Sequence, residues 1–306
     1  MAIATAQNQI ASNIFKTWII MFGFTVFAVG IVYVFALGFG YPLPDALGFT
    51  GMALIFAGIM NIVSYFYSDK MVLAISGAKP VSLASNRELY HLVENLCIAA
   101  GLPLPKIYII EDTAPNAFAT GRNPQHGVIC FTTGILSKLN KQELEGVIAH
   151  ELSHIQNRDI LLSSVVAILV GFIALLADWF LRMTWFGNRD REENNNGSPI
   201  FFALALVAAI LAPLVATLIQ LAISRRREYL ADASGVVLTR NPQGLASALT
   251  KISGDREPLE AANRATAHLY IINPLKGSGA VGWFAGLFNT HPPLSERIKA
   301  LNAMKG

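Results

Sequence analysis

Long apolar segments alternate with charged segments along the chain. No Asp, Glu, Lys or Arg occurs in residues 17–44, 46–68, 160–177 or 194–224. A helix that crosses the hydrocarbon core of a bilayer needs about 20 mainly apolar residues. Residues 18–37, 47–67 and 199–223 reach that length, and residues 160–177 lie at its short end. The pattern predicts four membrane helices, although the third and fourth are also compatible with a hydrophobic hairpin that does not fully span.

Two stretches with mixed charge separate and follow these segments. Because neither stretch is longer than about 90 residues, we expect them to fold together as one water-facing domain. The second pair of membrane segments interrupts that domain, with a loop near residues 187–197. The predicted boundaries are 1–69 for the first membrane hairpin, 70–159, 160–224 for the second hairpin, and 225–306.

Local patterns place secondary structure within the water-facing stretches. Asn140 and Glu143 have the spacing of a capping box, which predicts that a helix begins there. Branched and aromatic residues predict strands, and apolar residues three or four apart predict helices. Helices are expected at residues 86–100, from 140 onwards and at 225–238, and strands at 106–110, 127–131 and, as a third candidate, 116–121.

Composition limits the class of protein. Apolar residues make up 53% of the chain and charged residues only 14%, against a usual share of about 25%. The net charge of +3 is too small for a surface that neutralises phosphates, so we expect no nucleic-acid partner. Cys97 and Cys130 lie in apolar contexts and are predicted to be buried thiols.

One motif on the helix after Asn140 carries chemistry. Residues 150–154 read HELSH, so His150 and His154 stand four apart on one face, where both imidazoles can bind one metal ion. Glu151 is placed to reach a water molecule at that ion and is the candidate catalytic base.

A catalytic zinc site needs a third protein ligand. Ile160 stands where an extended motif would have a further His, which excludes that subclass. A carboxylate on a later helix is the other solution, and Glu228 and Asp232 share one helical face. Glu228 would then bind zinc and Asp232 would orient an imidazole. On spacing alone, an acidic pair beside three Arg residues is more often a solvated ion-pair face than a metal site.

Several stretches together resemble the HtpX family of bacterial membrane zinc metalloproteases. They are HELSH at 150–154, SRRREYLAD at 224–232, THPPLSERI at 290–298, NAFATG at 116–121 and AHLYIINP at 267–274. The resemblance covers nearly the whole chain. It implies an α+β fold: a mainly helical integral membrane protein whose zincin-like (gluzincin) domain carries a small sheet.

The resemblance also implies the site and its use. His150, His154 and Glu228 would hold one Zn²⁺ per chain, and Glu151 would act as base. His291 is a candidate second donor for the developing oxyanion, and the stretch beginning at Asn116 resembles a substrate-binding strand edge. The implied substrates are membrane or unfolded polypeptides, cleaved in quality control under stress.

The implied location is the bacterial inner membrane, where the chain would be a multi-pass protein. Lys and Arg residues number seven on one side of the predicted segments and three in the loop at 182–198, which predicts a cytoplasmic active site. The sequence does not indicate an oligomeric state.

Two alternatives to this function remain. One is an activity like that of CAAX prenyl proteases, which are more distant relatives with more membrane helices. The other is a non-catalytic membrane scaffold with a structural zinc. Outside the motif helix, His268 is expected to have a structural role. Glu296 and Arg297 could take part in the site, but they could as easily form an ion pair on the surface.

Overall fold

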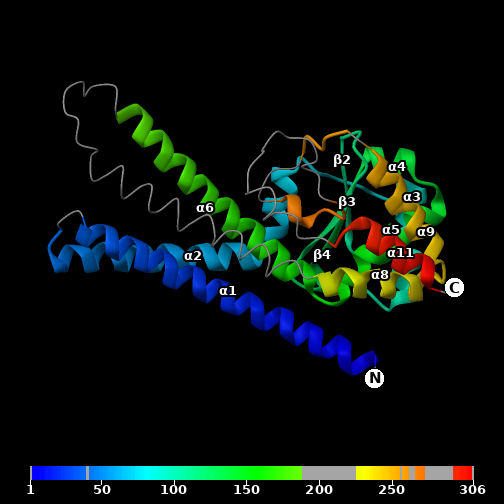
Figure 1. Cartoon of the computed structure of the whole chain (residues 1–306), viewed down its shortest axis with the longest axis horizontal. Coiled ribbons are helices and arrows are strands. Elements are labelled where there is room, and N and C mark those ends of the chain that lie inside the picture. The colour runs from blue at the N-terminus through cyan, green and yellow to red at the C-terminus, as the bar shows by residue number, and fades with distance from the viewer. Residues whose placement is uncertain are drawn as a thin grey trace.

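The computed structural model describes residues 2–38, 41–187, 225–255, 257–261, 266–272 and 292–304. In Figure 1 three long helices extend away from a mixed domain of short helices and strands. The fourth predicted membrane helix, most of the loop before it, and His291 lie outside the described residues.

The first two predicted membrane segments lie in helices longer than predicted, α1 (Ala2–Gly38) and α2 (Leu43–Ile75). Asn8–Val34 and Leu43–Ile75 are long and apolar enough to cross a membrane, and only 22% and 11% of their most apolar windows are buried. Phe22, Val34 and Ile55 are exposed by 71%, 67% and 66%. Because so much apolar surface is unfavourable in water, the two helices require lipid around them.

The third predicted segment lies in α6 (Asp159–Gly187). This helix follows α5 (Lys141–Gln156) after a bend of 83°. Its first half is buried, with Leu162 and Val165 in one cluster with Ile20 and Phe24 of α1. Within the described residues, two helices qualify as membrane spans, or three if α5 and α6 count as one bent span. A total of four therefore stays a prediction.

Among the described residues, the sheet has four strands in the order β1-β2-β4-β3. The strands are β1 (Lys79–Pro80), β2 (Lys106–Ile110), β3 (Ala117–Gly121) and β4 (Gly127–Thr132). Strands β2 and β4 are parallel, whereas β1 and β3 pair antiparallel to their neighbours. The three predicted strands are confirmed, and β3 forms one edge of the sheet.

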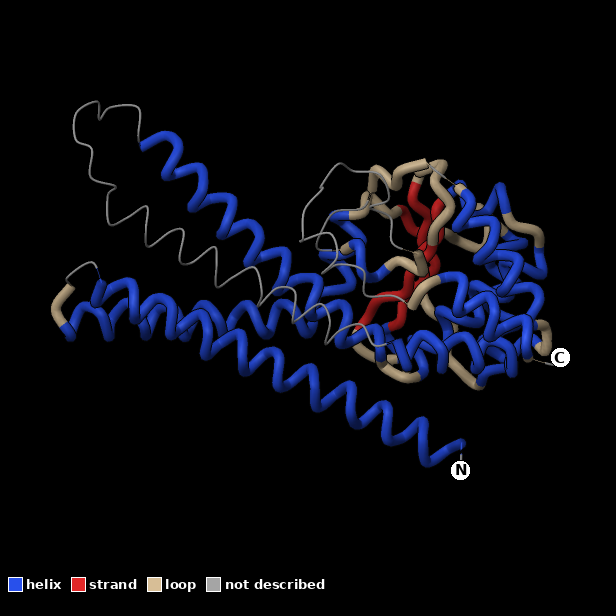
Figure 2. The backbone as a smooth tube through the Cα atoms, in the orientation of Figure 1, coloured by secondary structure: helices blue, strands red, loops and turns tan. Residues whose placement is uncertain are grey.

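The two faces of the sheet pack against different parts of the molecule. Ile129 and Phe131 of β4 face a core built from the helices of the mixed domain. Val128 and Cys130, which alternate with them, face Val72 of α2 and the first half of α6. Figure 2 shows the sheet between these two groups of helices. The membrane helices are therefore part of the packing that holds the sheet.

Capping residues mark the ends of two helices in the mixed domain. Asn86 caps α3 (Arg87–Ala100), and Gly101 follows its end with φ of 65°, a conformation that favours glycine. Asn140 and Glu143 form the predicted capping box of α5. The other helices are α4 (Thr133–Lys138), α8 (Arg225–Thr239), α9 (Pro242–Gly254) and α11 (Leu294–Ala303), with short 3₁₀ turns η1 (Pro124–His126) and η2 (Ala267–Leu269).

Two glycines let helices approach α5 closely. A Cβ on Gly146 of α5 would lie 2.8 Å from the backbone N of Leu245 in α9. A Cβ on Gly235 of α8 would lie 3.2 Å from the backbone N of His150. Residues of α5 thus share one core with residues of α8 and α9, which brings α8 beside the motif helix. The exact domain boundaries stay a prediction.

Candidate metal centre

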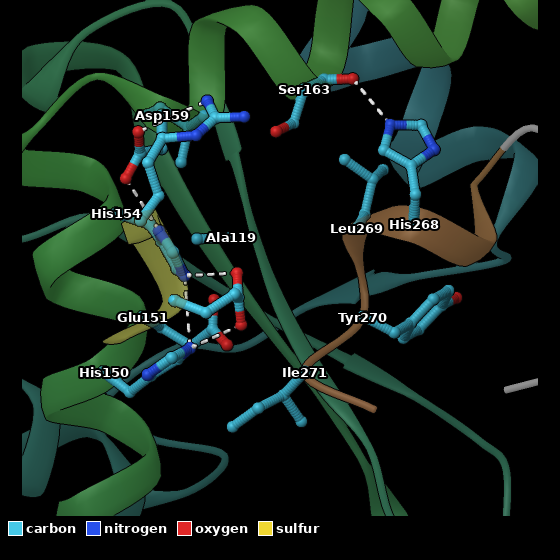
Figure 3. A pocket seen from close by; sticks show the side chains of 13 residues that line it. Ala119, His150, Glu151, His154, Asp159, Ser163, His268, Leu269, Tyr270 and Ile271 are labelled. Carbon is cyan, nitrogen blue, oxygen red and sulfur yellow. Dashed lines mark hydrogen bonds and ion pairs between the residues drawn. The ribbon is translucent and has the colours of Figure 1, made fainter. Parts of the chain in front are cut away.

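Three side chains from two helices converge at the bend between α5 and α6. His150 and His154 project from successive turns of α5, and their Nε2 atoms lie 3.1 Å apart. The carboxylate of Glu228 on α8 lies 3.8 Å from the His150 Nε2 and 3.6 Å from the His154 Nε2. One potential ligand atom from each residue lies within 4.8 Å of the other two (Figure 3). The set is suited to one divalent ion.

A carboxylate holds the far side of each imidazole. The Nδ1 of His150 lies 2.9 Å from Asp232 Oδ1, and the Nδ1 of His154 lies 2.9 Å from Asp159 Oδ2. A neutral imidazole whose Nδ1–H donates to a carboxylate keeps its Nε2 lone pair free. Both Nε2 atoms therefore face the shared space as ligands. This donor set of two imidazoles and one carboxylate fits zinc.

Arg297 of α11 is a buried cation beside the ligands. The side chain is fully buried, and its Nε and one terminal nitrogen donate to both oxygens of Asp232 at 2.8 and 2.7 Å. The other terminal nitrogen lies 3.3 Å from Glu228 Oε2 and donates to the carbonyl of Ile271 at 3.3 Å. The expected surface pair with Glu296 is therefore wrong, because Arg297 points into the core while Glu296 bonds Tyr229.

The ionisable groups of the centre respond to burial and to one another. Burial raises the pKa of the Glu151 carboxyl to about 7. Burial lowers the pKa of the His150 imidazole, although its carboxylate partner acts in the opposite direction. For His154, burial also lowers the pKa, but the hydrogen bond to Asp159 and the charge of Glu228 outweigh it and raise the pKa to about 9. A metal ion would compete here with a proton.

A pocket joins the ligand set to the edge of the sheet. Glu151 lines it together with Ala119 of β3. His268 borders the far end, where its Nε2 lies 3.1 Å from the carbonyl oxygen of Ser163 in α6. The lining also includes His150, His154, Asp159, Ile160, Arg227, Glu228, Leu269, Tyr270 and Ile271 (Figure 3).

A family model described as peptidase family M48 matches residues 83–305. The chain belongs to peptidase family M48. Its relatives named "Protease HtpX homolog" include those of Thermoanaerobacter pseudethanolicus and Caldanaerobacter subterraneus, which are 45% and 46% identical and aligned over 99% of both chains. The homolog of Dictyoglomus thermophilum is 44% identical over 98% of this chain and 95% of its own. The chain is thus a membrane metalloprotease of the HtpX type.

A solved structure supports the fold of this M48 peptidase. The crystal structure of S. mikatae Ste24p matches 94% of this chain and 67% of its own, with a TM-score of 0.50 and 23% identity. At that identity the likeness concerns the fold alone. The family assignment excludes the alternative of a non-catalytic scaffold.

Some of the predicted site residues of the M48 peptidase come together at the metal centre, and others do not. His150, His154, Glu228 and Glu151 come together, and Asp232 bonds His150 as its spacing suggested. A solvated ion-pair face is wrong for the acidic pair on α8, since Glu228 is 6% and Asp232 1% exposed.

Asn116 lies beside the pocket rather than in its lining. Its amide donates to the carbonyl of Ile272 at 3.0 Å and thereby holds residues 269–272 against the start of β3.

The sequence did not predict that Asp159 bonds His154 or that Arg297 bonds Asp232. Asp159 follows His154 by five residues, and this short spacing was the one local feature that could have indicated its role. Arg297 lies 147 residues from His150, and no local pattern links them.

Proposed function

We propose that this membrane metalloprotease is a zinc-dependent endopeptidase that cleaves unfolded or damaged membrane proteins. One Zn²⁺ per chain would be held by His150, His154 and Glu228. The observation that carries the proposal is the convergence of these three ligands beside Glu151, in a pocket that Ala119 of the β3 edge also lines. When bound, zinc acts as a Lewis acid that polarises a carbonyl and favours attack by water near neutral pH.

Glu151 is the proton carrier in this proposal. Its carboxyl lines the pocket beside the ligands, one residue along α5 from His150, but it is not a member of the ligand set. A carboxyl with a pKa near neutrality can take the proton of the attacking water and later give it to the leaving amine. Its 2% exposure keeps bulk solvent from competing for that proton.

The edge of β3 is the proposed binding surface for the peptide. Asn116 O accepts from Thr132 of β4, whereas Ala117 O accepts from Ile271 on the opposite side. Because backbone groups alternate along a strand, the N–H and C=O of Ala119 also point away from β4, into the pocket. Proteases commonly bind an extended peptide as an added strand. Ile271 already occupies the edge at Ala117, so the added strand would pair from Ala119 onwards.

The membrane setting points to substrates at the bilayer surface. The α5–α6 bend that carries His154 lies where α6 begins to pack against α1 and α2. Segments of membrane proteins that leave the bilayer unfolded would reach this site. The excess of Lys and Arg beside the predicted segments places it on the cytoplasmic side of a bacterial inner membrane in this proposal.

Proteolysis of a detergent-solubilised, destabilised membrane protein tests the proposal. The full chain should cleave it when zinc is supplied, should stop when a chelator removes the metal, and should resume when zinc is restored. The Glu151→Gln variant is the matched control, because it keeps the ligands and the side-chain shape. Cleavage that continues unchanged in Glu151→Gln, or without metal, would refute the proposal.

A further inference from the structure

A polar contact joins the first membrane helix to the metal centre. Asn13 of α1 is fully buried. Its Nδ2 donates to Asp159 Oδ1 at 2.6 Å and to the carbonyl of Asn157 at 3.0 Å. The other oxygen of Asp159 lies 2.9 Å from the Nδ1 of His154. Asn13 is thus two hydrogen bonds away from a candidate metal ligand.

The neighbours of Asn13 determine how its amide is oriented. Its Oδ1 lies 3.3 Å from Gln9 Nε2 and 3.5 Å from a terminal nitrogen of Arg227, and both of these are donors. Its nitrogen faces two acceptors. The reversed amide would place an oxygen against the carboxylate of Asp159, which is unfavourable. The amide therefore serves Asp159 as a donor.

Asp159 needs this donor because it is only 5% exposed. A buried carboxylate without enough hydrogen bonds is costly. Apart from Asn13, the described partner of its Oδ1 is Arg227, at the longer distance of 3.5 Å. Without Asn13, the Asp159 carboxylate loses a hydrogen bond that fixes its orientation toward His154. A less well oriented imidazole of His154 would bind the metal ion more weakly.

We propose that Asn13 is a positioning residue of the metal centre and acts through Asp159 on His154. The proposal rests on the proposed function, since it takes His154 as a zinc ligand. It gives the first membrane helix a part in the site beyond anchoring the chain. On this proposal, the packing of α1 against the start of α6 contributes to metal affinity.

Zinc binding by the purified full chain in detergent tests this inference. The probe is Zn²⁺ alone, in competition with a chromophoric chelator. Asn13→Leu nearly keeps the side-chain volume and suits a membrane helix, but it removes the donor. We expect zinc affinity to fall about 3- to 10-fold, below the 10- to 100-fold typical for a direct partner of a ligand.

Asn61→Leu is the matched control. Asn61 of α2 also bonds across the membrane helices, to Met21 O at 3.1 Å and Thr25 Oγ1 at 2.8 Å, and among the described residues these bonds do not reach the metal centre. Its substitution should leave zinc affinity unchanged. An equal change in both variants, or no change in either, would mean that Asn13 serves helix packing alone and would overturn the inference.

A double-variant cycle gives a second readout. If Asn13 acts through Asp159, Asn13→Leu should change zinc affinity little once Asp159→Asn is present, because coupled residues are non-additive. Additive effects would overturn the inference while leaving the protease proposal intact. A wild-type chain that binds no zinc would overturn both.

Discussion

At the scale of single residues, two outer carboxylates determine how the ligands are presented. Asp232 and Asp159 each hold one imidazole, and each is held in turn by a donor distant in sequence, Arg297 or Asn13. The motif predicted the histidines, whereas the site role of Glu228 on α8 came from the family resemblance, because spacing alone favoured a solvated ion-pair face. The two donors could not be predicted, because hydrogen bonds across 65 and 146 positions leave no periodic signal.

Replacing Arg297 should weaken the metal centre. Arg297→Lys keeps the charge but cannot bond both oxygens of Asp232 and also reach Glu228. We expect zinc affinity to fall about 10- to 100-fold, as for other direct partners of metal ligands. Equilibrium dialysis against a zinc buffer would measure it.

The control for Arg297 is its neighbour on α11. Glu296→Gln alters an exposed side chain that bonds only Tyr229 among the described contacts, so zinc affinity should stay at the wild-type value. Wild-type affinity in Arg297→Lys would show that the buried cation does not support the ligands.

At the scale of elements, the site depends on how closely helices approach α5. Sequence patterns predicted α3, α5, β2 and β4 because capping residues and alternation are local. They missed β1, which has two residues and includes a proline, and they could not reveal the close helix contacts at Gly146 and Gly235. Those contacts depend on the packing of helices that are distant in sequence.

A methyl group at Gly146 should force α9 away from α5. The added Cβ would lie 2.8 Å from the Leu245 backbone, which cannot move as a flexible side chain would. Overpacking of this kind costs about 1–3 kcal/mol. The midpoint of thermal unfolding in detergent should fall for Gly146→Ala and not for Gly254→Ala, whose Cβ meets nothing within 4 Å. Equal midpoints would remove close packing as the reason for this glycine.

The strand edge offers a second test at this scale. Ala119→Pro removes the N–H that points into the pocket and should strongly reduce cleavage of an extended peptide. Zinc content should remain at the wild-type level, because no metal ligand lies on β3. Cleavage at the wild-type rate would exclude this edge from substrate binding.

At the scale of the whole molecule, the sheet lies between the helices of the mixed domain on one side and the end of α2 with the first half of α6 on the other. The sequence predicted a membrane protein because its segments without charged residues are long enough to cross a bilayer. Sequence did not predict that β4 packs directly on the membrane helices. Long-range packing of this kind makes the protease domain and its membrane anchor one structural unit.

The orientation in the membrane can be checked by labelling. Cys97 and Cys130 are buried, so they contribute little background. A membrane-impermeant thiol reagent applied to spheroplasts should label Asn195→Cys and not Gln142→Cys, which is exposed at the start of α5. Labelling of Gln142→Cys alone would place the metal centre on the other side.

The measurement that tests the central claim most directly is zinc content beside cleavage rate in three variants. Glu228→Ala should lose both, since it removes a ligand, whereas Asp232→Ala should show an intermediate loss of zinc. Glu151→Gln should keep about one zinc per chain while the rate falls by about 10²- to 10⁴-fold, because only the base is lost. Full zinc and full activity in Glu228→Ala would contradict the account of the metal centre.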